Sequence, residues 1–262
     1  MRKIILISVV TIFTILLISI TYLSIYGVKT DSFNNFINNK IKEYNPKITL
    51  KLDQAFIKLN ISQNSLNINT ISASFISGNN PIKISTIEIN LDLIKFLKKE
   101  NSIKNIKIKS SDNLIKDVTS FLNTIDFDLS RYFIYSQIKN GLINFELESQ
   151  FDDINQNIYS YTVAGSVNDA ELNIIGYDNF DNINFNFQAK DKEVQISNLK
   201  FNYQETILIS KNLEIREEKN NAYYIKGDIE NTKALINPNL IFKFANIKQD
   251  YLSNKDILFQ SK

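Results

Sequence analysis

The chain of 262 residues contains no cysteine, histidine or tryptophan, and it has only one methionine, three prolines and six glycines. Without thiolates and imidazoles it cannot build the metal sites that use those ligands. It also lacks a cysteine nucleophile and a serine–histidine–aspartate relay. No disulfide can form, so cysteine usage indicates no redox compartment. From these absences we expect no enzyme activity, no cofactor and no metal ion.

The charges of the chain are almost balanced. Lys and Arg number 30 against 28 Asp and Glu, and Arg2 and Lys3 account for the net charge of +2. Nucleic-acid binding needs a clustered basic face, so we expect no nucleic acid as partner. We interpret the densest basic stretch as a solvated loop and strand face rather than a site for an anionic surface. It contains Lys98, Lys99, Lys104, Lys107 and Lys109.

The N-terminal region carries a long uncharged run. No charged residue lies between Lys3 and Lys29, and isoleucine, leucine and valine dominate the run. About 20 apolar helical residues span the roughly 30 Å of a bilayer core. Serine and threonine are tolerated there because their hydroxyls can bond to helix carbonyls. We therefore predict a transmembrane anchor over residues 4–26, preceded by a tip at residues 1–3.

The orientation of the anchor follows from its flanks. Arg2 and Lys3 place the N-terminus in the cytoplasm, and Tyr22 and Tyr26 suit the far interface. In a bacterium with two membranes, this predicts a single-pass inner-membrane protein whose bulk is periplasmic. The alternative is a cleaved signal peptide, which has a shorter apolar run and a small-x-small cleavage site. The length of the run and the sequence Leu23–Gly27 favour the uncleaved anchor.

The remainder of the chain divides into a short helix, two modules and a tail. Apolar residues at helical spacing predict a juxtamembrane amphipathic helix over 31–45, capped at Asp31-Ser32. Alternating apolar residues then predict strands, each with one apolar and one polar face. We assign 48–125 to a first β module with short helices, at Leu93–Leu97 and from Ser111 or Asp112 to Ile125. The remaining segments are an antiparallel strand module over 131–230 and a tail over 231–262.

Finer features of these segments are also expected. Asn168-Asp169 predicts a turn between two strands, and the best loop candidates are Asn123–Asp128 and Glu217–Asn221. The tail is predicted to form a helix after Pro238. The run Ile257–Phe259 is predicted to begin a further strand.

The order of these elements resembles the N-terminal region of the AsmA-like family, which includes AsmA, TamB and YhdP. The resemblance is carried by the run from Ile87 to Ile108, IEINLDLIKFLKKENSIKNIKI, in which an alternating strand leads into a short leucine-rich helix, a basic turn and another strand. The stretches Val163–Leu172, Ile183–Phe187 and Ile225–Ile229 are similar to the repeated strand modules of the same family.

This resemblance implies a mainly β fold with a few helices, in which an N-terminal transmembrane helix precedes a curled, largely antiparallel sheet of groove-like or taco-like form. It implies that the apolar face carries phospholipid acyl chains between the two membranes and supports outer-membrane biogenesis. For each inward residue, the alternative is an ordinary core position. The candidate lipid contacts are Ile57, Leu59, Leu66, Ile68, Ile87, Ile89, Phe145, Phe185, Phe187, Ile196 and Phe201.

Two other functions remain open from the residues. The chain could be a non-enzymatic, membrane-anchored scaffold or assembly factor whose sheet edges bind other envelope proteins. An enzyme would need convergent carboxylates, for which Asp152-Asp153 and Glu217-Glu218 are the candidates. Neighbouring strand residues point to opposite faces, so we interpret both pairs as solvated loop residues.

Overall fold

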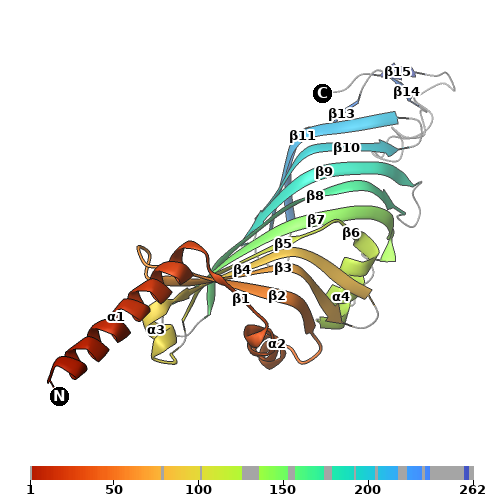
Figure 1. Ribbon diagram of the computed structural model, residues 1–262. Coiled ribbons are helices and arrows are strands. Elements are labelled where there is room, and N and C mark those ends of the chain that lie inside the picture. Colours follow the sequence, from red (N-terminus) through yellow and green to blue (C-terminus); the bar gives the residue numbers. More distant parts are fainter. Residues whose placement is uncertain are drawn as a thin grey trace. The chain divides into compact units, whose positions relative to one another are not determined.

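The structure is a computed structural model (Figure 1). It describes residues 2–77, 80–100, 102–125, 136–152, 157–173, 179–191, 193–203, 206–217, 223–231, 234–236 and 257–259. The described helices are α1 (Arg2–Ile25), α2 (Ser32–Tyr44), α3 (Leu93–Leu97) and α4 (Ile115–Ile125). The long strands are β2 (Thr49–Asn60), β3 (Ser65–Ser77), β4 (Asn80–Asp92), β5 (Ile103–Ser110), β7 (Ile138–Phe151), β8 (Ile158–Leu172), β9 (Phe180–Lys190), β10 (Glu193–Tyr203) and β11 (Thr206–Glu217). The short ones are β1 (Val28–Thr30), β6 (Asn113–Leu114), β12 (Tyr223–Gly227), β13 (Glu230–Asn231), β14 (Ala234–Ile236) and β15 (Ile257–Phe259).

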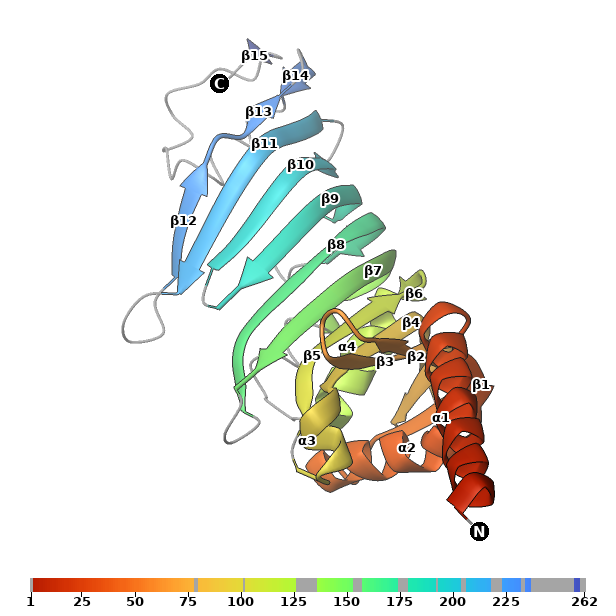
Figure 2. The same cartoon turned by 60° about the vertical axis from the view of Figure 1, so that its left-hand side comes forward.

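The strands form one large antiparallel sheet that follows the order of the chain. Its order is β1-β2-β3-β4-β5-β7-β8-β9-β10-β11-β12, with β6 pairing with β7 and β13 pairing with β11. The strands β14 and β15 pair separately. In the second unit, the strands β9 to β11 run side by side (Figure 2). The prediction of a mainly β, largely antiparallel fold behind an N-terminal apolar helix is confirmed.

The chain divides into two compact units whose limits differ from the predicted modules. The first unit is Met1–Ser111 with Glu146–Tyr161, and the second is Asp112–Phe145 with Thr162–Lys262. The strands β7 and β8 therefore each contribute residues to both units. The helix α4, which we placed at the end of the first module, belongs to the second unit.

Helix α1 matches the predicted anchor. Residues Leu6–Ile25 form a span with a mean hydropathy of 2.4, long and apolar enough to cross a membrane. The hydroxyls of Thr11 and Thr14 donate to the carbonyls of Ile7 (2.9 Å) and Val10 (2.8 Å), as expected for polar side chains in such a helix. Apolar side chains are exposed all round the helix, which is the distribution that a lipid-facing helix requires.

The other predicted helices are present, with two local corrections. Asp31 occupies the N-cap position of α2, but its side chain makes no capping hydrogen bond. Helix α4 begins at Ile115 rather than at Ser111 or Asp112. The reason is that Asn113 and Leu114 pair as β6 with β7, so this backbone is extended and cannot join the helix.

Most strands of the sheet are long. Runs that alternate in two different phases merge into single strands, and a residue with positive φ lies at the change of phase in several of them. These residues are Ser72 in β3 (φ 59°), Asp169 in β8 (φ 50°), Asn182 in β9 (φ 52°) and Asn198 in β10 (φ 56°). The predicted turn at Asn168-Asp169 is therefore wrong, because β8 continues through it to Leu172. A local kink changes the phase of alternation, so apolar residues on both sides of it stay on one face.

Asparagine suits these kinks because it tolerates the left-handed region better than other side chains with a Cβ. We expect Asn198→Val to lower the free energy of unfolding by about 1–2 kcal/mol, since a β-branched residue is strained at this φ. Asn198→Gly should be nearly neutral. Urea unfolding followed by circular dichroism tests both variants, and equal stability of Val and Gly would contradict the kink.

The C-terminal tail is described only in part. Ile257–Phe259 forms the predicted strand, as β15. The helix predicted after Pro238 lies outside the described residues. Of the two predicted loops, Asn123–Ile125 instead ends α4, Glu217 ends β11, and the other positions lie outside the described residues.

The strand part of the basic stretch is matched by acidic neighbours. Lys104 Nζ lies 3.3 Å from Asp92 Oδ2, and Lys107 Nζ lies 2.6 Å from Glu146 Oε1. Lys109 stands opposite Glu146 in the pairing of β5 with β7. The interpretation as a solvated strand face is therefore supported for these three lysines of β5.

Glu146→Gln tests this pairing. The hydrogen bond with Lys107 lowers the pKa of Glu146, and the same contact raises the pKa of Lys107. The carboxylate of Glu146 therefore stabilises the fold at pH values above its pKa in the unfolded chain. This stabilisation is lost as the pH falls through the lower pKa that Glu146 has in the folded protein. The contribution of Lys107 is lost as the pH rises through its own raised pKa. Because both side chains are well exposed, we expect a loss of less than about 1 kcal/mol at pH 7.

The measurement is urea unfolding at neutral and at acidic pH. The difference between Glu146→Gln and the parent should disappear once the carboxylate is protonated. Glu100→Gln is a suitable control because Glu100 is exposed. A difference that persists in acid would show that the charge of Glu146 is not the cause.

Candidate lipid-binding face

Five of the six candidate contacts of the first unit lie in its packed core. Ile57, Leu59, Leu66, Ile68 and Ile87 are buried, Ile68 to 1% exposure, and Ile89 is half-buried. They form cross-strand rows: Ile57, Ile68 and Ile89 stand opposite one another, as do Leu59, Leu66 and Leu91. The side chains of the five buried residues are already covered by protein. In this unit the structure favours the core interpretation over lipid contact.

The five candidates of the second unit keep part of their surface. Phe145, Phe185, Phe187, Ile196 and Phe201 are all half-buried. Ile196 stands directly opposite Phe187 on β9 and Leu213 on β11. The structure thus brings Phe187 and Ile196 together on one face of the sheet.

Glycines make room for the large side chains of this row. Gly165 stands opposite Phe187, and an added Cβ there would lie 2.8 Å from the Phe187 ring and 2.1 Å from the Asn144 carbonyl oxygen. Gly227 stands opposite Leu213, and an added Cβ would lie 2.4 Å from Leu213 Cδ2. Both large side chains therefore lie across a glycine of the neighbouring strand.

Helix α4 covers part of this face. Its first residue, Ile115, is buried with Val167 and Ala170 of β8. Phe185 and Phe187 pack against this cluster, together with Ile138, Ile143 and Ile183. The two phenylalanine rings are therefore shared between the core under α4 and the exposed surface. Phe201 has another neighbour, the ring of Phe180, at a centroid distance of 5.9 Å.

Further along the sheet the apolar residues remain partly exposed. Val194 pairs with Ile215 and Ile196 with Leu213, and all four are half-buried. Ile225 pairs with Ile215 and is 65% exposed. We call these five residues of β10, β11 and β12 the open face. Only Ile196 was among the candidates, although the alternation of the other four was visible in the sequence.

The opposite face of the second unit is polar and hydrogen-bonded. Asn144 Nδ2 donates to Asp112 Oδ1 at 2.9 Å, and Ser166 Oγ donates to Asn144 Oδ1 at 3.2 Å. Arg216 binds Glu214 on its own strand and lies 3.8 Å from Glu193 of β10. The sheet of this unit is therefore amphipathic, with one wet face and one apolar face.

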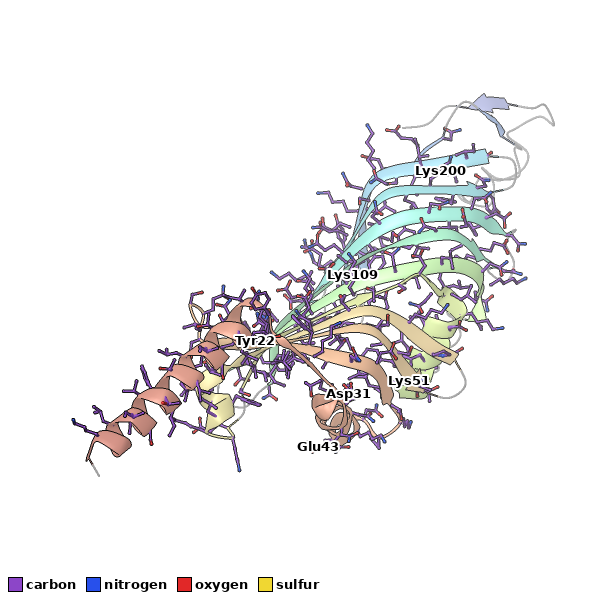
Figure 3. The ribbon with its side chains drawn as sticks, in the orientation of Figure 1. Tyr22, Asp31, Glu43, Lys51, Lys109 and Lys200 are labelled. Atoms are coloured by element: carbon purple, nitrogen blue, oxygen red, sulfur yellow. The ribbon has the colours of Figure 1, made fainter. Side chains whose placement is uncertain are left out.

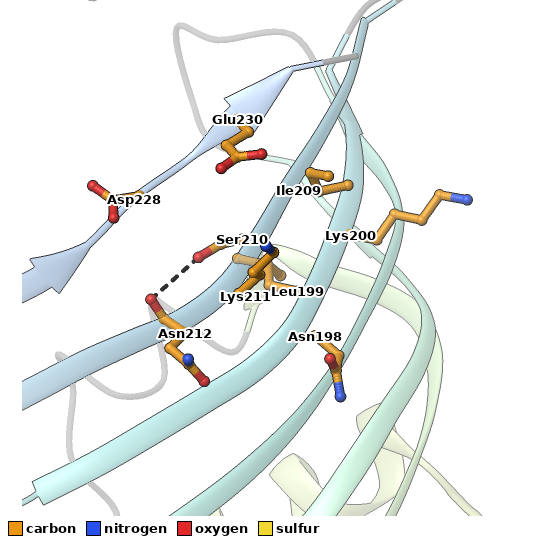
Figure 4. A pocket seen from close by; sticks show the side chains of 9 residues that line it. All are labelled: Asn198, Leu199, Lys200, Ile209, Ser210, Lys211, Asn212, Asp228 and Glu230. Atoms are coloured by element: carbon orange, nitrogen blue, oxygen red, sulfur yellow. Dashed lines mark hydrogen bonds between the residues drawn. The ribbon is translucent and has the colours of Figure 1, made fainter. Parts of the chain in front are cut away.

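The hollows of the second unit involve only part of the open face. One of about 770 Å³ is lined by Ile196 and Leu213 of that face, and by polar residues that alternate with the apolar row, among them Asn186, Gln188, Gln195, Ser197 and Glu214. The other, of about 390 Å³, lies where β12 and β13 leave β11 (Figure 4). There Ser210 Oγ donates to the Asn212 carbonyl at 3.3 Å, and Lys200 points away from Asp228 and Glu230. The open face is thus an apolar surface rather than an enclosed cavity.

Of the two acidic pairs, only Asp152 and Glu217 lie among the described residues. The Asp152 carboxylate accepts from the Asn157 amide at 3.0 Å, and the Asp152 amide donates to the Asn157 carbonyl at 2.9 Å. Asp152 is therefore held to Asn157, the residue before β8, by two hydrogen bonds. Glu217 ends β11 opposite Tyr223. Asp153 and Glu218 lie outside the described residues, and no group of three metal-ligating side chains occurs among the others.

These features define the class of the molecule: a mainly antiparallel β protein with one N-terminal helix that could span a membrane. Comparison with family models, with curated proteins and with solved structures finds no match for the chain.

Proposed function

We propose that the protein is a membrane-anchored, non-enzymatic lipid-binding protein of the AsmA-like type, which holds phospholipid acyl chains on the open face. In this proposal α1 crosses the inner membrane once, with Arg2 and Lys3 in the cytoplasm and the sheet in the periplasm. The lipid passes between the membranes and so supports outer-membrane biogenesis.

The observation that carries the proposal is the partial exposure of the open face. Its five side chains are aliphatic and contiguous in the strand register, and none of them carries a charge. Contiguous apolar surface on a soluble domain marks a site for another apolar surface. Transfer of each acyl CH₂ group from water to such a surface is worth about 0.8 kcal/mol, so contact along the length of an acyl chain can supply binding energy without any catalytic group.

Lipid analysis of the purified full chain tests the proposal. The protein is extracted from membranes in a mild detergent, and its bound molecules are identified by native mass spectrometry and by solvent extraction. We expect phospholipid to remain bound after detergent washing. Recovery of protein partners without phospholipid would instead support the scaffold alternative, and recovery of neither would contradict both.

A further inference from the structure

A second apolar surface lies in the first unit, at the end of the sheet where α1 arrives. Strand β1 follows α1 and pairs antiparallel with β2, with Val28 opposite Ile57. Because the two strands are antiparallel, the residues that precede Val28 lie beside the part of β2 that follows Ile57. The backbone that leads back to α1 therefore approaches the Asn60 end of β2. The junction is close: an added Cβ at Gly27 (φ 69°) would lie 2.7 Å from the Ile57 carbonyl oxygen. The end of α1 thus lies at the same end of the sheet as the turn between β2 and β3.

Helix α3 adjoins this turn. The Asn64 amide donates to the Ile61 carbonyl at 3.2 Å, which closes the turn. The Leu93 amide then donates to the Asn64 carbonyl at 3.1 Å, and Ser65 stands opposite Asp92. The turn and the first residue of α3 are therefore joined directly by hydrogen bonds.

Both ends of α3 are fixed. Asp92 Oδ1 accepts from the Lys95 amide at 3.0 Å, and this bond lowers the pKa of Asp92, so the cap stays ionised. At the other end the Glu100 amide donates to the Lys95 carbonyl at 2.9 Å, and the Lys99 amide donates to the Phe96 carbonyl at 3.0 Å. With Lys99 at φ 61°, this is a Schellman closure formed without glycine.

This arrangement holds apolar side chains in solvent. Leu97 is 71% exposed, Ile94 is 52% exposed, and Ile61 in the neighbouring turn is 58% exposed. Lys98 and Lys99 follow directly and are exposed, and the adjacent acidic residue is Glu100, also exposed. We call Ile61, Ile94, Leu97, Lys98 and Lys99 the apolar tip.

We propose that the apolar tip docks on the surface of the bilayer that α1 crosses, with Ile61, Ile94 and Leu97 in the interface and the two lysines beside anionic head groups. The inference rests on the membrane-spanning role of α1 in the proposed function, and it is independent of lipid binding by the open face. Apolar side chains flanked by lysines are the composition of interfacial membrane contacts.

The bilayer is the occupant that the structure favours. The tip and the end of α1 share one end of the same unit, so the anchor keeps the tip near the membrane at high effective concentration. The weak affinity of three apolar residues then suffices. Docking would fix the first unit at two points and so limit its rotation about the anchor.

Depth-dependent fluorescence quenching tests the proposal on the full chain. Because the protein has no cysteine, single-cysteine variants can be labelled uniquely with an environment-sensitive dye. The test variant is Leu97→Cys and the anchor control is Leu16→Cys. The distal control is Lys51→Cys, roughly 30 Å along β2 from the tip by strand geometry and away from Tyr22 in Figure 3. The variants are reconstituted in phosphatidylcholine–phosphatidylglycerol vesicles that contain spin-labelled phosphatidylcholine.

We expect the dyes at positions 16 and 97 to lose most of their emission to the lipid quencher, and the dye at 51 to keep it. Quenching at 97 should weaken in vesicles of phosphatidylcholine alone, and in the variant that also carries Lys98→Glu and Lys99→Glu. If the dye at 16 is quenched while the dye at 97 keeps its emission like the dye at 51, α1 crosses the bilayer but the apolar tip does not dock on it. That result would overturn the docking proposal and leave the membrane-spanning role of α1 unchanged. An unquenched dye at 16 would reject the anchor itself.

One further outcome distinguishes a protein partner. If the dye at 97 is shielded from aqueous iodide but is not quenched by the spin-labelled lipid, the tip is covered by protein. That result would overturn docking on the bilayer.

Discussion

Ile225→Asp is expected to remove most of the phospholipid that copurifies with the protein. Ile225 belongs to the open face, where it stands opposite Ile215 at 65% exposure. A carboxylate there would have to lose its hydration against acyl chains, which costs several kcal/mol or prevents contact. Because the side chain is largely exposed, the substitution should change the free energy of unfolding by less than about 0.5 kcal/mol.

Tyr224→Asp provides the matched control. Tyr224 is the preceding residue of β12, is 48% exposed, and stands opposite Arg216, on the other face of the sheet. Tyr224→Asp introduces the same charge on the same strand, and we expect the full chain with this substitution to keep its phospholipid. Equal lipid loss in both variants would assign the effect to β12 or to net charge rather than to the open face. Unchanged lipid in Ile225→Asp would remove this residue from the binding surface.

Gly165→Ala is expected to give the largest loss of stability. The new Cβ would lie 2.1 Å from the Asn144 carbonyl oxygen and 2.8 Å from the Phe187 ring. The first contact is with backbone, so the neighbouring strand has to move, and Phe187 has to leave its place across the glycine. Overpacking of this kind costs about 1–3 kcal/mol, and we expect the upper end of that range.

Urea unfolding of the full chain measures this loss, with Ala164→Ser as the control. Ala164 is the preceding residue of β8 and points to the other face, so a hydroxyl there should change stability by less than about 0.5 kcal/mol. Equal stability of Gly165→Ala and the parent would show that β7 and β8 do not approach as closely as described.

The helices were predictable because their signals are local. An uncharged apolar run predicted α1, and apolar spacing of three and four predicted α2, α3 and α4 close to their observed bounds. The kinks were not predictable in the same way. Asn198 and Asp169 carry the same local signal as residues of true turns, and only pairing with neighbouring strands shows that β10 and β8 continue through them.

The sequence predicts which residues of the candidate site share one face of the sheet, but it does not predict which of them are exposed. Alternation shows which residues share one side of a strand, and Phe187 and Ile196 do lie together. Alternation does not show whether other parts of the chain cover that face, because those contacts are made by residues far apart in the sequence. Ile68 and Ile225 have the same alternating pattern, yet one is 1% exposed and the other is 65% exposed. The exposure of the apolar tip could not be predicted either, because the sequence pattern around Leu97 is that of an ordinary apolar face of a short helix.

Site-specific photocrosslinking can show whether phospholipid lies on the apolar face of the second unit. A photoreactive phenylalanine analogue is placed at Phe187 or Ile196 on the apolar row, and at Gln188 or Gln195 on the polar face of the same strands. After irradiation of cells, the purified full chain is analysed by mass spectrometry. Phospholipid adducts at 187 and 196, with none at 188 and 195, are the predicted result. Adducts with protein alone, or lipid adducts equally frequent on both faces, would show that the apolar face is not a lipid-binding surface.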